Sequence, residues 1–335
     1  MDCVLLCNKD APHICAQDIN ELINKEAEVQ SGACIVRNTS TTDIATLAYY
    51  CQSTYKVVAL MHTMKVKQKN ITPEQIEEIL EHNKKIPLTT EEKQLLQDAQ
   101  TFAMRVTKLD ETTMPSQELE ELIGGWYNTR AKEQNHELSV KLNKPALPLH
   151  AIITAKECLI GVDVTGIELH KRPYKLMPYP SSLNGVMAYT IARAVGVTKE
   201  SNVVDPFCGS GTIPIEIALY QQHVSPLALN TQMTGLHIPF FKKSFEEIKE
   251  QTRTQKASAS KQVTGYDNQF KIISQANKHA KLARVKDSVV LSKVDVDWID
   301  MKFEKDSIDI IITNPPKENK KTNNYKEIRK LYDDF

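Results

Sequence analysis

The sequence lacks several features that would assign it quickly to a class of protein. It has no long apolar run among its 335 residues, so we expect no membrane-spanning helix and a chain with room for two or three domains. Its first residues lack a basic segment followed by a long apolar one, so we expect no secretory signal and a cytoplasmic location. Acidic and basic residues are balanced, 42 of each. This balance argues against a wholly basic nucleic-acid-binding surface, although a local patch can still attract phosphate.

The cysteines follow no spacing that is typical of a metal site or of a disulfide framework. They are odd in number, scattered along the chain, and form no CxxC pair. Their spacing therefore predicts neither a zinc site nor disulfide bonds. The seven cysteines are Cys3, Cys7, Cys15, Cys34, Cys51, Cys158 and Cys208.

Hydrophobic periodicity divides the chain into three blocks with a charged stretch after the first. Residues 1–65 predict a small α+β domain, because the strand-like segments GACIVRN and YKVVALMHTM flank a helical one. Residues 66–97 are charged and contain a helix start at TPEQ, which predicts a helical linker or insertion. Residues 98–176 combine an alternating strand, a capped helix and a strand pair. Residues 177–335 alternate apolar strands with helices, which predicts a doubly wound parallel sheet.

The segment VVDPFCGSGT places a carboxylate and a glycine-rich loop at the end of a predicted strand. Parallel sheets bind ligands beyond the carboxyl ends of their strands. Gly209 and Gly211 allow a tight turn and a close approach to a ligand, and the helix that follows offers free N–H groups. The loop matches neither GxGxxG nor a Walker loop. Asp205 would suit a cationic or hydroxyl-rich ligand better than a pyrophosphate.

Acidic residues also follow the next two predicted strands. Asp267 ends the second strand, where a carboxylate can accept hydrogen bonds from both hydroxyls of a ribose. Asp295 and Asp297 follow the third strand, and either could accept a hydrogen bond from an adenine amine. Each aspartate alone could be an N-cap. Together with Asp205 they predict a site for an adenosine that carries a positive group.

The fourth predicted strand ends in the turn Asn314-Pro315-Pro316. Proline fixes the backbone, so the Pro315 carbonyl and the Asn314 side chain can face one point and accept hydrogen bonds there. An exocyclic base amine is a poor nucleophile because its lone pair is conjugated with the ring. Two acceptors that hold its hydrogens would favour a pyramidal nitrogen and direct the lone pair. Asn-Pro-Pro alone is a weak signal. On a strand that follows a DPFCGSGT loop, it predicts the transfer of a group to the exocyclic amine of a base.

Residues 203–316 resemble the class I S-adenosylmethionine-dependent methyltransferases that act on exocyclic amines. DPFCGSGT is similar to their glycine-rich cofactor loop, and TNPP is similar to their [DN]PP[YF] catalytic motif. Upstream, TKLDETTMPSQELEELIGGWY and LIGVDVTGIELHKRPYKL resemble the THUMP module of RNA-modifying enzymes. The whole chain resembles the THUMP-containing tRNA guanine-N2-methyltransferases. Asn before Pro-Pro is more similar to the enzymes that modify position 6 in the acceptor stem than to those that modify position 10.

The resemblance implies an α/β fold, with a Rossmann-like class I methyltransferase domain in residues 177–335. It implies a ferredoxin-like domain in residues 1–65, matched more loosely, and a THUMP domain in residues 98–176, with residues 66–97 as the helical linker. A complete domain of this class has seven strands, three of them after the catalytic strand, and here only a helix follows. We therefore expect an incomplete domain after the fourth strand. The alternatives are a protein partner or the helix itself covering the open sheet edge.

The resemblance also implies S-adenosylmethionine as the cofactor, with no metal. Asp205 and the glycine loop would hold the methionine end, Asp267 and Asn268 the ribose, and Asp297 the adenine. Asp297 is preferred to Asp295 for its distance from the Asn-Pro-Pro strand. The implied loop residues are Asp205, Pro206, Phe207, Cys208, Gly209, Ser210, Gly211 and Thr212.

The implied macromolecular partner is tRNA, which the THUMP and ferredoxin-like domains would bind. Asn314, Pro315 and Pro316 would receive the 2-amino group of the target guanine. The residues expected to contact RNA are His170, Lys171, Arg172 and Lys317.

The sequence departs from the family motif at Lys317, where the family has Tyr or Phe stacked on the flipped base. Stacking of a base on an aromatic ring contributes roughly 1–3 kcal/mol, so its loss would slow the reaction about 10–100-fold or more. Two other functions therefore remain open. One is a non-catalytic, degenerate THUMP protein that binds RNA, and the other is an amino-methyltransferase that acts on rRNA or DNA.

Overall fold

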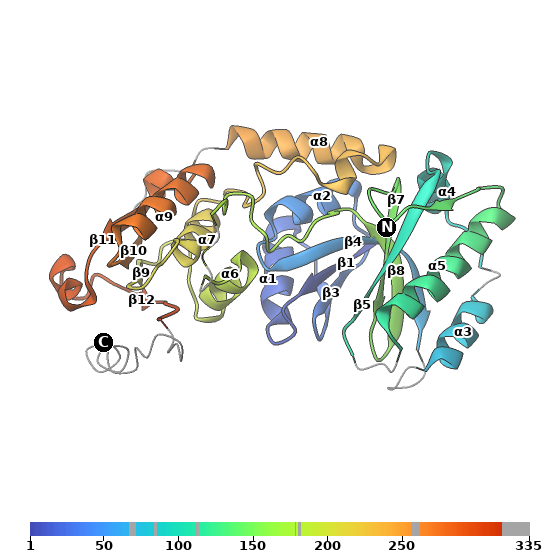
Figure 1. The fold of residues 1–335 in the computed structure, drawn as a ribbon, viewed down its shortest axis with the longest axis horizontal. Coiled ribbons are helices and arrows are strands. Elements are labelled where there is room, and N and C mark those ends of the chain that lie inside the picture. The colour runs from blue at the N-terminus through green and yellow to red at the C-terminus, as the bar shows by residue number, and fades with distance from the viewer. Residues whose placement is uncertain are drawn as a thin grey trace. The chain divides into compact units, whose positions relative to one another are not determined.

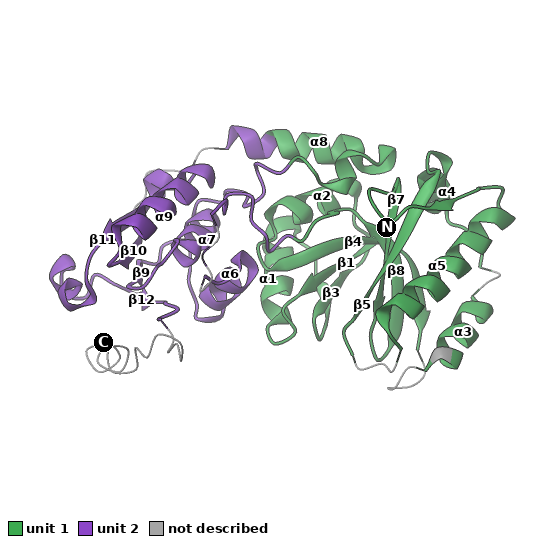
Figure 2. Ribbon diagram, in the orientation of Figure 1, with its two compact units in different colours: residues 1–168, 231–250 green, residues 169–230, 251–335 purple. Residues whose placement is uncertain are grey.

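The computed structural model describes residues 1–66, 72–83, 86–110, 114–177, 179, 182–255, 257 and 262–316. Contacts divide the chain into two compact units (Figure 2). The first unit comprises residues 1–168 and 231–250, and the second comprises residues 169–230 and 251–335. Each unit has its own sheet, and the two are described separately below.

The first unit is built on a sheet of eight strands in the order β2-β3-β1-β4-β8-β7-β5-β6 (Figure 1). The strands are β1 (Asp2–Cys7), β2 (Ala27–Gln30), β3 (Ala33–Val36), β4 (Thr54–Lys65), β5 (Thr101–Lys108), β6 (Ser139–Val140), β7 (Leu147–Ile153) and β8 (Glu157–Asp163). Strand β5 runs parallel to β6 and β7, and the other pairs are antiparallel. The antiparallel pair β4–β8 joins the strands of the first two sequence blocks into one sheet.

Side chains alternate between the two faces of this sheet, as the pleat of a strand requires. On β1, Val4 and Leu6 belong to a core cluster that also contains Ile152 and Leu159. Cys3, Leu5 and Cys7 alternate with them and are buried as well. Strand β1 is therefore covered on both faces.

Helices α1 (Pro12–Ile23) and α2 (Thr41–Tyr50) contact the N-terminal strands, and α5 (Ser116–Glu133) contacts β5. Helix α1 begins with a proline, which suits the first turn because its missing N–H would have no partner there. Helix α2 begins with a capping box, in which Ser40 and Asp43 each accept a hydrogen bond from the other's backbone N–H. Local sequence thus sets both helix starts.

The charged stretch after β4 forms two helices, α3 (Pro73–His82) and α4 (Thr90–Gln97). Both are anchored in the first unit. Trp126 of α5 donates its indole N–H to the Leu80 carbonyl of α3 at 2.8 Å. Glu92 of α4 is completely buried, with a carboxylate oxygen 3.9 Å from Arg130 of α5. The stretch 66–97 therefore contributes packed elements to the unit. Helix α8 (Pro239–Thr254) lies within the first unit as far as residue 250.

The second unit contains a parallel sheet of four described strands in the order β11-β10-β9-β12. The strands are β9 (Val203–Asp205), β10 (Val263–Asp267), β11 (Val289–Lys293) and β12 (Ile310–Ile311). Helices α6 (Gly185–Ala194), α7 (Thr212–Gln221) and α9 (Phe270–Leu282) belong to the same unit. This is the parallel sheet that the alternating pattern predicts, although β12 is shorter than its apolar run. Among the described strands, β12 lies at an edge, where Ile311 is exposed.

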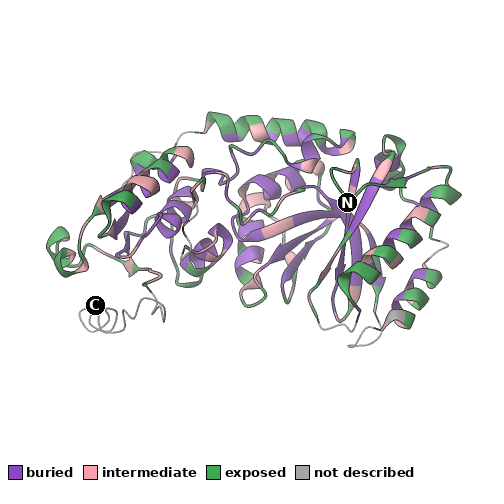
Figure 3. Ribbon diagram, in the orientation of Figure 1, coloured by how far each residue is buried: buried purple, intermediate pink, exposed green. Residues whose placement is uncertain are grey.

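Helix α7 is buried around almost its whole circumference, from Thr212 to Leu219 (Figure 3). A helix that is apolar on all sides belongs in a core. Its first turn follows the glycine-rich loop directly, so the loop is attached to a helix that is buried from Thr212 to Leu219. Within the described residues, no helix is both long and apolar enough to cross a membrane.

Candidate active site

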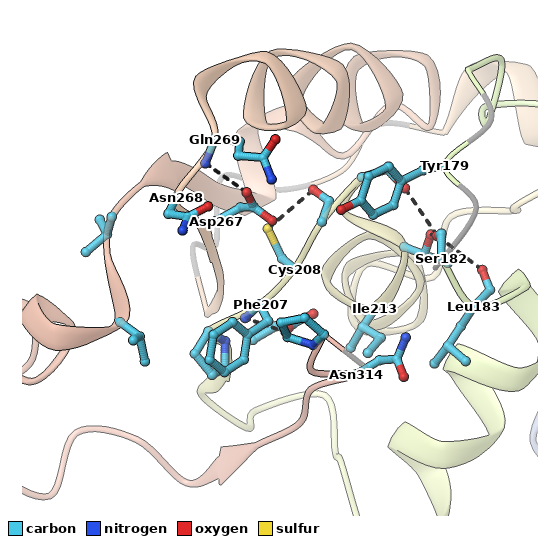
Figure 4. Close-up of a pocket in the computed structure, with 18 of the residues that line it drawn as sticks. Tyr179, Ser182, Leu183, Phe207, Cys208, Ile213, Asp267, Asn268, Gln269 and Asn314 are labelled. Carbon is cyan, nitrogen blue, oxygen red and sulfur yellow. Dashed lines mark hydrogen bonds between the residues drawn. The ribbon is translucent and has the colours of Figure 1, made fainter. Parts of the chain in front are cut away.

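A pocket lies in the second unit where the carboxyl ends of β9, β10 and β11 meet the turn after β12 (Figure 4). It brings together most of the cofactor and catalytic residues that the sequence predicts. Those that line it are Asp205, Pro206, Phe207, Cys208, Gly209, Ser210, Thr212, Asp267, Asn268, Asn314 and Pro316. Gly211, Asp297 and Pro315 are not among the lining residues.

The parallel register explains why the strand ends converge. Gly265 of β10 pairs with Asp205, and Asp267 pairs with Lys293 at the end of β11. The carboxyl ends of β9, β10 and β11 therefore lie at one edge of the sheet, where parallel α/β sheets bind ligands.

The carboxyl group of Asp205 is buried and hydrogen-bonded. Its Oδ1 accepts hydrogen bonds from the Thr313 hydroxyl at 2.7 Å and from the Phe207 N–H at 3.2 Å. Burial raises the pKa of Asp205 to about 7, although both hydrogen bonds oppose the rise. A positive ligand at this position would lower that pKa again and favour the ionised form.

Asp267 is half-buried at the tip of β10, and its Oδ1 accepts a hydrogen bond from the Gln269 N–H at 2.9 Å. Burial raises its pKa as well. The Val294 N–H donates to the Asp267 carbonyl at 3.2 Å, which holds the end of β11 beside this tip. Asp295 follows immediately and lines the pocket, whereas Asp297 lies in a short 3-10 turn outside the lining. Of the two aspartates that the sequence offers for the adenine, Asp295 lines the pocket and Asp297 does not.

The glycine loop is shaped by backbone conformations that disfavour other residues. Gly209 and Gly211 have φ of 51° and 82°, in the left-handed region. A Cβ on Gly209 would lie 3.0 Å from the ring of Tyr179, and one on Gly211 would lie 3.1 Å from the Cβ of Ala276. Gly209 thus belongs to the pocket wall, whereas Gly211 allows the loop to pack against α9.

The segment before α6 supplies lining residues that no sequence motif indicated, namely Tyr179, Ser182 and Leu183. The Ser182 hydroxyl lies 2.7 Å from the Thr212 hydroxyl and accepts a hydrogen bond from the Lys175 ammonium at 2.7 Å. These bonds connect the segment to the first turn of α7. The contact spans about thirty positions along the chain, so short-range patterns could not have revealed it.

Asn314 and Pro316 line the same pocket as Asp205. The residue before Asn314 is Thr313, whose hydroxyl donates to Asp205 as described above. The predicted cofactor loop and the predicted catalytic turn are therefore joined by a direct hydrogen bond.

Arg172 does not fulfil the prediction that it contacts RNA. Its guanidinium group is completely buried and donates from Nε and Nη2 to the two carboxylate oxygens of Glu216, at 2.9 and 3.0 Å. Tyr174 also donates to this carboxylate at 2.7 Å. The Nη1 of Arg172 donates to the Leu169 carbonyl at 2.8 Å, and because the guanidinium group is fully buried a phosphate cannot reach it in this structure. Lys171 is exposed and His170 is half-buried, while Lys317 lies outside the described residues.

The parallel sheet, the acidic strand tips, the glycine loop and the Asn-Pro-Pro turn together define an α/β methyltransferase domain. Sequence comparison agrees. Residues 172–335 match the family described as an RMKL-like methyltransferase domain, and residues 75–163 match the THUMP domain. The chain thus contains one region that matches the THUMP domain and one that matches an RMKL-like methyltransferase domain. The THUMP match includes α3 and α4 from the stretch that the sequence predicted to be a linker.

Two curated relatives carry specific names. The tRNA (guanine(6)-N2)-methyltransferase of Methanocaldococcus jannaschii is 28% identical over 244 residues, which cover 72% of this chain and 63% of the relative. The ribosomal RNA large subunit methyltransferase K/L of Vibrio parahaemolyticus is 26% identical over 183 residues, which cover 53% of this chain and 26% of the relative. The chain spans less than two thirds of the length of either relative.

A solved structure shares the fold. The crystal structure of SMU.472 complexed with SAH aligns with a TM-score of 0.70 and 17% identity, covering 99% of this chain and 84% of the other. The chain therefore shares the fold of this structure.

The buried Arg172–Glu216 pair generates a stability prediction. Arg172→Met should lower the free energy of unfolding by about 3–5 kcal/mol, because it leaves the Glu216 carboxylate buried without its partner. The matched control is the neighbouring exposed Lys171→Met, which should change it by less than about 0.5 kcal/mol. Urea unfolding measures both. An Arg172→Met variant as stable as the wild type, with weakened RNA binding, would restore the RNA-contact role.

The raised pKa of Asp205 generates a prediction about pH. As pH rises from about 4 to about 7, the unfolded carboxyl loses its proton while the folded one keeps it. The wild type should therefore lose stability over this window relative to Asp205→Asn, by about 1.4 kcal/mol for each pH unit. Above pH 7 the difference should stay constant.

Urea unfolding of the wild type and Asp205→Asn between pH 4 and pH 8 measures this difference. The exposed Asp287→Asn is the control, and it should track the wild type. A constant difference between the wild type and Asp205→Asn across the window would show that the pKa of Asp205 is not raised.

Proposed function

We propose that this chain transfers a methyl group from S-adenosylmethionine to the N2 amine of a guanosine in tRNA, at position 6 of the acceptor stem. The observation that carries the proposal is the shared pocket of Asp205, Asp267, Asp295 and Asn314. The name of the Methanocaldococcus jannaschii relative supports the substrate and the position. A cytoplasmic location would follow from such a substrate.

The pocket suits S-adenosylmethionine in its chemistry. We assign the ribose hydroxyls to Asp267, the adenine amine to Asp295 and the methionine end to Asp205 with the glycine loop. Carboxylates accept hydrogen bonds from hydroxyl, amine and ammonium groups alike. A Cβ at Gly209 would lie 3.0 Å from the Tyr179 ring, so glycine lets this ring pack closely on the loop in the pocket wall. The neighbour SMU.472, solved with SAH, supports this cofactor class.

When bound, the cofactor supplies an activated methyl group on a positively charged sulfur. The role of Asn314 in the proposal is to accept a hydrogen from the guanine amine, with the Pro315 carbonyl as a second acceptor. Two acceptors would hold the amine in line for attack, and such positioning can contribute several kcal/mol. Asp205 fixes this turn through Thr313. A base in a stem must also leave the stack, which costs a few kcal/mol.

We assign tRNA binding to the THUMP domain and to the ferredoxin-like N-terminal segment, for which we retain the proposed bounds 98–176 and 1–65. Exposed Lys171 and half-buried His170 remain proposed RNA contacts. The predicted incompleteness of the catalytic domain, and a partner at its sheet edge, concern residues after Pro316 that the structure does not describe.

The function is tested by incubating the full chain with S-adenosylmethionine and unmodified tRNA, rRNA or DNA. Nuclease digests are then analysed by mass spectrometry. We expect N2-methylguanosine in tRNA, mapped to position 6. Product in rRNA alone would favour the second candidate, which rests on the similarity to the Vibrio enzyme. Cofactor binding without product on any substrate would favour a non-catalytic RNA-binding protein.

Asn314→Ala tests the proposed amine acceptor. We expect it to lower the rate of product formation by about 10²–10³-fold, the effect of removing one preorganised hydrogen-bonding group. S-adenosylhomocysteine should bind Asn314→Ala with unchanged affinity in calorimetry. The control is Asn202→Ala, an exposed asparagine of the same unit outside the pocket. Full activity in Asn314→Ala would exclude this residue from catalysis.

Lys317→Tyr tests the departure from the family motif. If an aromatic ring at this position stacks on the flipped base, kcat/KM for tRNA should rise about tenfold or more. Lys317→Met removes the charge without adding a ring, and it should not produce the same rise. Equal rates for the wild type and Lys317→Tyr would show that the missing ring does not limit the enzyme.

A further inference from the structure

Three cysteines that are far apart in the sequence meet in the core of the first unit. The Sγ atoms of Cys7, Cys15 and Cys34 all lie within 4.8 Å of one another, and all three residues are buried. A fourth buried cysteine, Cys51, lies beside Cys15 but outside the group of three sulfurs that are mutually within 4.8 Å. We call these four residues the thiol cluster. It shares no residue with the Asp205 pocket.

The sheet register explains how two members of the thiol cluster meet. Cys34 of β3 lies directly opposite Leu5 of β1, so their side chains point to the same face. Cys7 is two residues beyond Leu5 and points to that face too. Cys7 and Cys34 are therefore diagonal neighbours on one face of the sheet.

Helices bring the other two thiols to this face. Cys15 lies on the buried side of α1, which contacts both β1 and β3 (Figure 1). Cys51 is the C-terminal cap of α2, which packs against α1. Four different elements thus supply one sulfur each, which is why the spacing along the chain gives no sign of the cluster.

The separation of the sulfurs fits one small soft cation. In a tetrahedral zinc site with Zn–S bonds of about 2.3 Å, neighbouring sulfurs are about 3.8 Å apart. The sulfurs of Cys7, Cys15 and Cys34 lie within 4.8 Å of one another, up to about 1 Å wider than this value, so a bound ion would draw them together. An iron–sulfur cluster places several irons and sulfides between its cysteines, so it needs wider spacing. A disulfide would join only two of the three neighbouring sulfurs, whereas a metal ion would bind all three.

Polar groups contact the sulfurs of the thiol cluster, and the Cys34 thiol donates a hydrogen bond to the Pro12 carbonyl at 3.2 Å. The N–H of Ala16, in the first turns of α1, lies within hydrogen-bonding reach of the Cys34 sulfur, and a helix N-terminus stabilises negative charge. Cys51 Sγ lies 3.4 Å from the Ser53 hydroxyl, which donates to Asp18 at 2.5 Å. Such outer partners orient metal ligands.

We propose that Cys7, Cys15 and Cys34 bind one structural Zn²⁺ ion, and that Cys51 moves toward them to become the fourth ligand. Binding replaces four S–H bonds with four Zn–S bonds and releases the protons to solvent. The site is closed, with no open coordination position for a substrate, so its function is to hold α1 and α2 on the sheet. This proposal replaces the expectation of no metal, which rested on cysteine spacing alone, and it is independent of methyl transfer.

The first test is the metal content of the untagged full chain purified from zinc-supplemented medium, measured by plasma mass spectrometry. We expect one zinc per chain. Removal with a strong chelator should lower the melting temperature by roughly 10 °C or more, since zinc binding contributes to folding. Zinc alone should then restore it. A metal-free chain, or a chelated chain with an unchanged melting temperature, would overturn the proposal.

The second test uses variants. Cys15→Ala should lose the bound zinc, whereas Cys3→Ala should retain it. Cys3 is the matched control because it lies on β1, is equally buried and is not a member of the thiol cluster. Zinc retained in full by Cys15→Ala would contradict the assignment.

A third measurement needs no variant, in case Cys15→Ala does not fold. Cobalt(II) added to the chelated wild type should give the intense thiolate charge-transfer absorption of a tetrahedral tetrathiolate site. Thiol titration of the chelated, unfolded chain without reductant should find all seven cysteines as free thiols. A disulfide within the thiol cluster, or copper in place of zinc, would overturn the proposal.

Discussion

The hydrogen bond from the Thr313 hydroxyl to the buried Asp205 carboxylate is the constraint on which the site depends. It joins the end of β9 to the chain just after β12. The acceptor, Asp205, begins the cofactor loop, and the donor, Thr313, directly precedes the Asn-Pro-Pro turn. Burying a carboxyl group opposes ionisation. Because the pKa of Asp205 is near neutrality, a positively charged ligand that lowers this pKa would convert the carboxyl group from its neutral to its ionised form. A surface aspartate with an ordinary pKa is already ionised and would change less.

A second buried carboxylate, that of Glu216, fixes the helix that follows the glycine loop. Glu216 lies on α7, the helix that the loop opens, and it is fixed by Arg172 and Tyr174. Gly185 at the start of α6 permits this arrangement, since a Cβ there would lie 2.4 Å from the Arg172 side chain. The loop is therefore positioned by a fully packed helix. Such support lets a site keep its geometry without its ligand.

Local signals predicted most of the pocket. The strand ends at Asp205 and Asp267, the loop at Gly209 and the turn at Asn314 each follow from short patterns, and the parallel register then brings them together. What failed depends on contacts between distant residues. Arg172 looked like a phosphate ligand because its partner Glu216 is 44 positions away. Three other features also depend on contacts between distant residues and gave no signal in the sequence. They are the place of Asp295 in the pocket lining, the single sheet of the first unit and the thiol cluster.

The central claim is that neighbouring strand tips form one pocket where a sulfonium methyl group meets a base amine. A crystal structure of the chain with S-adenosylhomocysteine tests it most directly. The account predicts the ribose hydroxyls within hydrogen-bonding distance of the Asp267 carboxylate, the adenine beside Asp295, and the sulfur on the side that faces Asn314. A ligand bound elsewhere, or one whose sulfur points away from Asn314, would contradict it.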